Sequence, residues 1–136
     1  MKRRTALRSI AGIATASAAQ AAPGNSIQLH TDLAVPPAKE AALLADFEKR
    51  FLPLIRKAPG FIDAKLLKFR QANVGKAPER YNYRLVQIFE SEEKREAWTK
   101  NPAHKVAWHE ALEPYVQTPF VAYLYDIRVE GRRTNA

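Results

Sequence analysis

The sequence contains no cysteine among its 136 residues. A disulfide framework, a zinc–thiolate site and a cysteine nucleophile are therefore excluded. The chain also lacks an uninterrupted apolar run of about 18 residues, the length that a membrane-spanning helix needs. We expect no membrane insertion of the mature protein. The length is that of one domain, and the 46% of hydrophobic residues are enough for a single core.

Motifs of several enzyme classes are absent as well. The chain has only five glycines and carries no glycine-rich phosphate loop, nucleophile elbow or HExxH metal motif. His104 and His109 are five residues apart, which places them about 140° apart around a helix. They are too far apart to bind one metal ion, so the sequence predicts no metal site.

The N-terminal residues have the composition of a secretory signal peptide. Basic residues gather between Lys2 and Arg8, an alanine-rich apolar stretch covers Ile10–Ala19, and Ala19-Gln20-Ala21 is a small-x-small cleavage site. The pair Arg3-Arg4 resembles the twin-arginine signal, with an ordinary Sec signal as the alternative. We expect residues 1–21 to be cleaved and the protein to be periplasmic or secreted.

The net charge is modest once these residues are removed. The formal charge of +8 falls to about +4, because residues 1–21 hold four of the 22 basic residues and none of the 14 acidic ones. The remaining basic residues alternate with acids, as in Glu90–Glu96. Nucleic-acid-binding proteins instead gather basic residues into one patch. We therefore expect no nucleic-acid partner.

Sequence periodicity predicts one domain over residues 22–130 and a loose polar tail over 131–136. Alternation of apolar and polar residues predicts four strands, at Ser26–Val35, Phe61–Arg70, Tyr81–Glu90 and Phe120–Val129. Pro36-Pro37 opens a helix after the first strand. Pro53 falls late in this helix and predicts a kink or a tightened last turn.

The second helical segment, Ser91–Tyr115, carries both tryptophans and two of the three histidines. Ser91 is a suitable N-cap for one helix, and Asn101-Pro102 begins a second helix that Pro114 is expected to end. A wide apolar face follows from helical spacing in the set Ala103, Ala107, Trp108, Ala111, Leu112 and Tyr115.

The predicted order β-α-β-β-α-β is that of a ferredoxin-like α+β fold with a four-stranded antiparallel sheet. Two helices can cover only one face of such a sheet. Yet the strands carry apolar side chains on both faces, and in the second strand Ile62, Ala64 and Leu66 alternate with Phe61, Leu67 and Phe69. An uncovered apolar face predicts a second copy of the chain, and hence a homodimer.

From about Ser26 to Val129 the sequence resembles the antibiotic biosynthesis monooxygenase (ABM) domain family of dimeric α+β barrels. The resemblance depends on the element order, on Pro59-Gly60-Phe61 at the second strand, and on the stretch IFESEEKREAWTKNPAHKVAWHE at Ile88–Glu110. The family includes cofactor-independent oxygenases of phenols or quinones, haem-degrading enzymes and members without known activity. It implies a homodimer with a cavity between sheet and helices in each subunit.

The implied cavity suggests a set of site residues. His104 and His109 are the candidate proton acceptors, and His104 shares a helical face with Trp108. The expected contacts to a small aromatic ligand are Trp98, Trp108, Tyr83 and His30. Structural alternatives stand beside these roles: a packed tryptophan next to a helix-end histidine, a solvated pair of His109 with Glu113, and ordinary sheet tyrosines. Alternation does not decide which sheet face carries His30.

The haem-degrading branch of the family uses an asparagine on the first strand, and a tryptophan and an iron-ligating histidine on the second helical segment. Trp98 matches the tryptophan. At the family's spacing from this tryptophan, the position of the histidine is occupied by Trp108, and His109 follows one residue later. The first strand offers His30 and Thr31 instead of asparagine. One residue turns a helical side chain by about 100°. His109 would therefore face elsewhere unless the break at Asn101-Pro102 resets the register.

Three functions are consistent with these features. The first is an exported ABM-type oxygenase, without a cofactor, that acts on an aromatic or quinone-like compound. A deprotonated phenol can itself give an electron to dioxygen, so the protein need supply only a dry cavity, a proton acceptor and aromatic walls. The second is a non-catalytic ligand-binding or stress-related dimer. The third is a haem-binding or haem-degrading protein.

Overall fold

The computed structural model describes residues 25–134, so the predicted signal peptide lies outside the described residues. Four antiparallel strands form one sheet in the order β3-β4-β2-β5. Their bounds are β2 Ile27–Ala34, β3 Phe61–Lys68, β4 Tyr83–Phe89 and β5 Gln117–Asp126. This arrangement confirms the predicted ferredoxin-like α+β fold.

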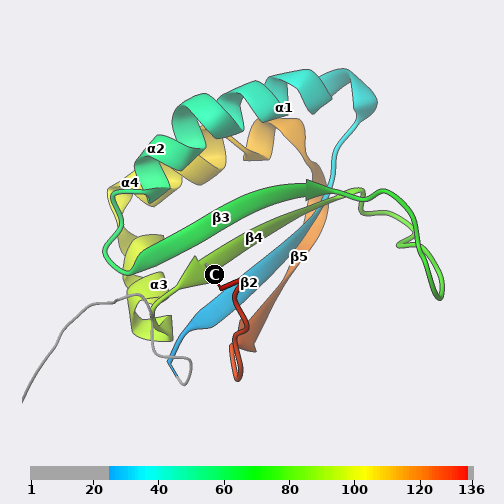
Figure 1. The fold of residues 1–136 in the computed structure, drawn as a ribbon. Coiled ribbons are helices and arrows are strands. Elements are labelled where there is room, and N and C mark those ends of the chain that lie inside the picture. The colour runs from blue at the N-terminus through cyan, green and yellow to red at the C-terminus, as the bar shows by residue number, and fades with distance from the viewer. Residues whose placement is uncertain (1–24, 135–136) are drawn as a thin grey trace, which may run out of the picture.

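The helices lie over one face of the sheet, where α1, α2 and α4 form a layer and α3 lies at one end (Figure 1). The first helical segment comprises a 3-10 turn Pro37–Lys39, α1 Glu40–Asp46, a π-helical turn Phe47–Phe51 and α2 Leu52–Ile55. The second comprises α3 Glu92–Lys100, α4 Pro102–Lys105, a π-helical turn Val106–Glu110 and a 3-10 turn Glu113–Tyr115. None of the helices within residues 25–134 is both long and apolar enough to cross a membrane.

The tightened last turn expected after Pro53 is confirmed, because the N–H groups of Lys57 and Ala58 donate to the carbonyls three residues back, those of Leu54 and Ile55, at 3.2 and 2.9 Å. The helix also widens into a π-helical turn, Phe47–Phe51, directly before α2. Proline has no N–H to donate to the carbonyl of Lys49, and its ring clashes with that carbonyl in a regular helix. A wider turn over Phe47–Phe51 avoids the clash. It also directs Phe47 and Phe51 into the core, where their rings stack with centroids 5.0 Å apart.

The predicted caps of the second segment are confirmed. The Lys94 backbone N–H donates to Ser91 Oγ at 3.2 Å, and the Ala103 N–H donates to Asn101 Oδ1 at 2.8 Å. The predicted end at Pro114 is wrong, because the helix ends at Glu110 and Pro114 lies in a separate 3-10 turn. The proline ring would clash with the carbonyl of residue 110 if the helix continued.

The core fills the space between the sheet and the helices. Its most deeply buried side chains come from both helical segments and from the sheet, namely Leu33, Leu43, Phe51, Ile55, Leu85, Phe89 and Leu112. Burying one such side chain stabilises the fold by about 1.5–3 kcal/mol. The layer that the family resemblance associates with a cavity is therefore tightly packed over much of its area.

One face assignment in β3 is wrong. Phe61 was expected on the same face as Leu67, but it packs against the core together with Leu66. The cause is a β-bulge between Phe61 and Asp63, where an extra residue interrupts the pairing with β4. Because side chains alternate with a period of two, one inserted residue reverses every later side chain relative to Phe61.

The strand ends also differ from the expected ones. β3 stops at Lys68 and β4 begins at Tyr83, two residues inside the predicted bounds. β5 begins at Gln117, three residues early, and ends at Asp126. It contains Pro119 because β5 is an edge strand, where a missing backbone N–H can face away from the neighbouring strand.

The sheet face away from the helices is uncovered in the described chain, and we call it the open face. Pairing register assigns to it Gln28, His30, Asp32, Asp63, Lys65, Leu67, Arg84, Val86, Ile88, Val121, Tyr123 and Tyr125. Leu67, Tyr123 and Tyr125 are 45%, 50% and 52% exposed. The open face thus presents large apolar and aromatic side chains to solvent.

Candidate functional site

The helix side of the sheet contains two contacting ring pairs. Trp98, in α3, is only 3% exposed and contacts the half-buried His104 of α4 edge-on, with ring centroids 5.4 Å apart. Trp108, in the π-helical turn, packs against Phe120 of β5 at 4.9 Å. Because Asn101 ends α3 and Pro102 begins α4, the chain turns sharply between Trp98 and His104. This turn brings the two rings together.

The environment of His104 favours its neutral form. Burial lowers the pKa of His104 below the usual value, and the nearby His109 and Arg95 lower it further. A histidine of lowered pKa is unprotonated at neutral pH and is therefore able to accept a proton. His104 consequently has the protonation state that a general base requires.

The second candidate proton acceptor lies elsewhere. The side chain of His109 is 57% exposed, and its Nδ1 lies 2.5 Å from Oε1 of Glu113. The break at Asn101-Pro102 therefore does not turn His109 toward the core. The inward-facing residue of this turn is Ala107, which is fully buried.

This geometry does not fit the haem ligation that the family resemblance suggested. An iron ligand at His109 would have to leave the Glu113 carboxylate and the surface to reach the layer between sheet and helices. Trp108 occupies the position that the spacing assigned to the histidine, and its ring is packed against Phe120.

His30 lies on the open face and is separated from the two ring pairs by the sheet. Nε2 of Gln28 donates to Nε2 of His30 at 2.7 Å, and the imidazole contacts the Tyr125 ring at 4.9 Å. Burial and the Arg84 charge lower the pKa of His30, while Asp32 acts in the opposite direction. His30 and Trp98 thus cannot line one cavity within a single subunit.

Tyr83 does face the helices, but at the other end of β4 from α3. Six residues of extended strand separate it from Phe89, a distance of about 20 Å. Its hydroxyl donates to Glu40, whose carboxylate also lies 2.7 Å from Nζ of Lys68. Burial, with the Glu40 carboxylate, raises the pKa of Tyr83 to about 12. This residue joins α1 to the sheet, away from His104.

A hollow of about 300 Å³ lies at the end of the sheet near the β3–β4 connection. Its walls include Asp32, Leu67 and Arg84 of the open face, together with Phe69 and Tyr81. Arg84 Nε donates to Asp32 Oδ1 at 2.7 Å within it. The sequence did not predict this hollow, because Asp32 and Arg84 meet only through the pairing of β2 with β4.

Two polar residues are buried on the helix side, and of the two only Thr31 was named from the sequence, as a substitute for the family's asparagine. Thr31 is 4% exposed and Gln87 is 7% exposed, and neither side chain hydrogen-bonds with another residue of the described range. A signal for Gln87 was present in the sequence. It follows Tyr83 and Leu85 on the apolar face of the third predicted strand, where alternation calls for a hydrophobic residue.

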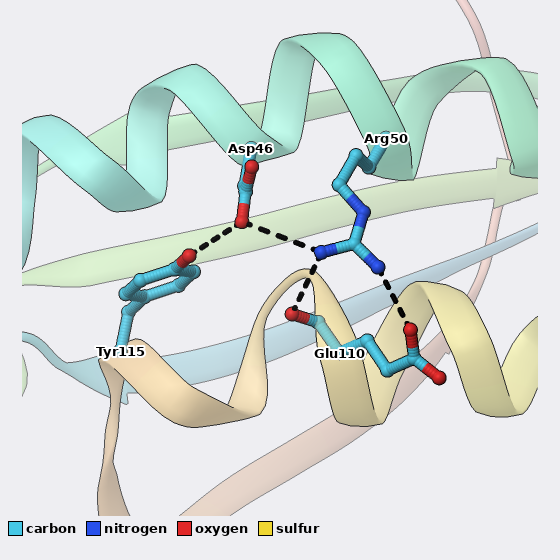
Figure 2. Close-up of polar contacts among 4 residues, drawn as sticks. All are labelled: Asp46, Arg50, Glu110 and Tyr115. Atoms are coloured by element: carbon cyan, nitrogen blue, oxygen red, sulfur yellow. Dashed lines mark hydrogen bonds and ion pairs between the residues drawn. The ribbon is translucent and has the colours of Figure 1, made fainter.

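Polar contacts hold the second helical segment against the first (Figure 2). Arg50 Nη2 lies 2.8 Å from Glu110 Oε1, and the Tyr115 hydroxyl donates to Asp46. These contacts lie at both ends of the stretch that follows Trp108, so they help to set the position of its ring. Among residues 25–134 there is no cluster of three or more side chains suited to holding a metal ion.

Comparison with solved structures shows the same fold at low sequence identity. The haem-degrader MhuD from Mycobacterium tuberculosis, solved with two haems in its active site, is 20% identical, with a TM-score of 0.61 over 78% of this chain and 99% of that one. SnoaB from Streptomyces nogalater, a cofactor-independent oxygenase, is 15% identical, with a TM-score of 0.57 over 81% and 96%.

A third structure is a dimeric protein of unknown function with a ferredoxin-like fold from Bacteroides fragilis. It is 12% identical, with a TM-score of 0.56 over 74% of this chain and 95% of that one. A search of curated protein sequences gives no match. Residues 26–111, more than half of the chain, match the family described as antibiotic biosynthesis monooxygenase. The fold, the element order and this match together show that the chain belongs to the antibiotic biosynthesis monooxygenase family.

Proposed function

We propose that this protein is an exported ABM-type oxygenase that acts, without a cofactor, on an aromatic or quinone-like compound. The observation that carries the proposal is the contact of the half-buried His104 with the buried Trp98. It places a neutral imidazole beside an aromatic wall on the helix side of the sheet. His104 is the proton acceptor, and Trp98 and Trp108 provide the aromatic contacts.

The chemistry begins with removal of the phenolic proton by His104. The resulting phenolate is electron-rich and can pass an electron to dioxygen, which is the oxidant. In the overall reaction, a phenol and one dioxygen give a quinone and one water. One oxygen atom enters the ring and the other leaves in water, and the substrate supplies every electron. The protein contributes orientation, exclusion of water and a base.

The active form in this proposal is a homodimer that pairs through the open face. Leu67, Tyr123 and Tyr125 would otherwise leave several hundred Å² of apolar surface in water, which is unusual for a monomer. At about 25 cal/mol per Å², covering such an area contributes several kcal/mol toward association. The described dimeric state of the Bacteroides fragilis protein with this fold supports the proposal.

Export to the periplasm or the medium is proposed from residues 1–21 alone. An exported enzyme that needs no cofactor has an advantage, because no nicotinamide or flavin has to be supplied outside the cytoplasm. The chemistry and the compartment are therefore mutually consistent.

Oxygen uptake tests the activity. Purified protein is mixed with 1-naphthol and a panel of hydroquinones, consumption of dioxygen is followed, and ¹⁸O₂ is used to label the product. We expect His104→Gln to lose most of the activity while the neighbouring surface variant Lys105→Gln keeps it. Ligand binding without oxygen uptake would indicate a non-catalytic binding dimer. A Soret band that titrates to one haem per chain, without such uptake, would indicate haem binding instead.

A further inference from the structure

Thr31 and Gln87 lie on the helix side of two neighbouring strands. Pairing register places Gln87 of β4 opposite Leu29 in β2 and opposite Ala64 in β3, while Thr31 lies opposite Leu85. The two polar residues are therefore diagonal neighbours on one face, at a Cβ separation of about 7–8 Å or less. Both belong to strands in the interior of the sheet.

Neither side chain has a hydrogen-bond partner within residues 25–134, although both are more than nine-tenths buried. The amide of glutamine has two N–H donors and an acceptor oxygen, and the threonine hydroxyl can donate and accept. Leaving such groups buried without partners costs free energy, and native proteins keep few of them. A polar atom from outside the described chain is the expected partner.

The surroundings of the two residues are apolar and partly small. Gln87 has Leu85 and Phe89 as its neighbours along the same face of β4, and Ala64 as its neighbour in β3. An environment with apolar walls and a few polar groups suits a flat hydrocarbon ring that carries an oxygen atom.

We propose that Gln87 and Thr31 bind a hydroxyl or carbonyl oxygen of the aromatic ligand and so select oxygenated rings over bare hydrocarbons. This inference rests on the proposed function, because it assumes that the ligand enters the layer between sheet and helices. An N–H group of the Gln87 amide donates to the oxygen of the phenol, whose proton is directed to His104, and it donates likewise to a quinone carbonyl. One amide group therefore serves both the reduced and the oxidised compound.

Equilibrium dialysis of 1-naphthol and of naphthalene against the purified protein tests this selection. The variants are Gln87→Leu and Thr31→Val, which keep the shape and remove the polar atoms, with Gln87→Met as a second shape-preserving variant. Gln71→Leu, in the exposed loop, is the matched control. We expect Gln87→Leu to weaken 1-naphthol binding about three- to tenfold and to leave naphthalene binding unchanged.

The melting temperature separates this role from a structural one. We expect Gln87→Leu to be at least as stable as wild type, because the buried amide is removed with its desolvation cost. If Gln87→Leu or Gln87→Met keeps the wild-type preference for 1-naphthol over naphthalene, the inference is wrong while the proposed function stands. If the wild-type protein binds both compounds equally, the inference is also wrong. If it binds neither, both the inference and the proposed function fail.

Discussion

The imidazole of His104 meets the indole of Trp98 edge-on, with ring centroids 5.4 Å apart and ring planes at 88°. An edge-to-face contact of this kind is favourable because the positive edge of one ring faces the negative face of the other. The Asn101-Pro102 break between the two residues produces it. In a continuous helix, residues 98 and 104 would lie about 120° apart around the helix axis, and their side chains would point in different directions.

The stability that His104 contributes depends on pH. Its pKa is lowered in the folded protein, chiefly by burial, so the unfolded chain binds more protons between the folded pKa and about 6.5. The stability that His104 contributes is present in full above pH 6.5, and it is lost as the pH falls through the pKa that His104 has in the folded protein. We expect His104→Gln to lose less stability than wild type between pH 7.5 and pH 5, as measured by urea denaturation.

His109→Gln is the control for that measurement, because His109 is exposed and paired at the surface. An NMR titration of wild type should also show one imidazole, absent from His104→Gln, with a midpoint below 6.5. A stability difference between wild type and His104→Gln that is equal at both pH values would contradict the assignment.

The two faces of β3 should respond differently to a buried charge. Leu67 lies on the open face, so Leu67→Asp should remain folded and become monomeric, since the charge would be buried in the dimer interface. Leu66 packs against the core, so Leu66→Asp should unfold the protein. Sedimentation equilibrium at micromolar concentration and circular dichroism distinguish these outcomes. A wild-type protein that stays monomeric at high concentration would defeat the dimer proposal.

Gly60 should tolerate alanine less well than Gly75. Both have positive φ, at +83° and +84°, so alanine costs about 1–2 kcal/mol of backbone strain at either position. At Gly60 the added Cβ would also meet Cβ and Cγ of Lys94 at 2.6 Å, whereas at Gly75 nothing lies within 4 Å. Overpacking adds about 1–3 kcal/mol. Denaturation midpoints that shift equally in Gly60→Ala and Gly75→Ala would show that α3 moves away freely.

The export route is testable through the paired arginines. A fusion of residues 1–23 to a reporter that folds before export should reach the periplasm, and Arg3→Lys with Arg4→Lys should abolish this transport, because the twin-arginine route reads the guanidinium pair. Arg8→Lys, which makes the same exchange outside the pair, is the control. Unchanged transport of the double variant by the twin-arginine route would leave Sec as the assignment.

Much of the fold could be predicted because its signals are local. The capping by Ser91 and Asn101 depends on residues two or three positions away, and the alternation of Tyr83, Leu85 and Phe89 depends only on the strand period. The order of these elements then leaves few ways to arrange four strands and two helical segments. The ferredoxin-like sheet and the family were accessible from the sequence for that reason.

The positions of the candidate site residues were decided by tertiary structure. A bulge against β4 moved Phe61 to the core face, strand pairing placed His30 on the open face, and a π-helical turn left His109 at the surface. Burial of Gln87 without a partner likewise depends on what covers β4. Each of these outcomes is set by register between segments far apart in the chain, and a shift of one residue reverses the face that a side chain occupies.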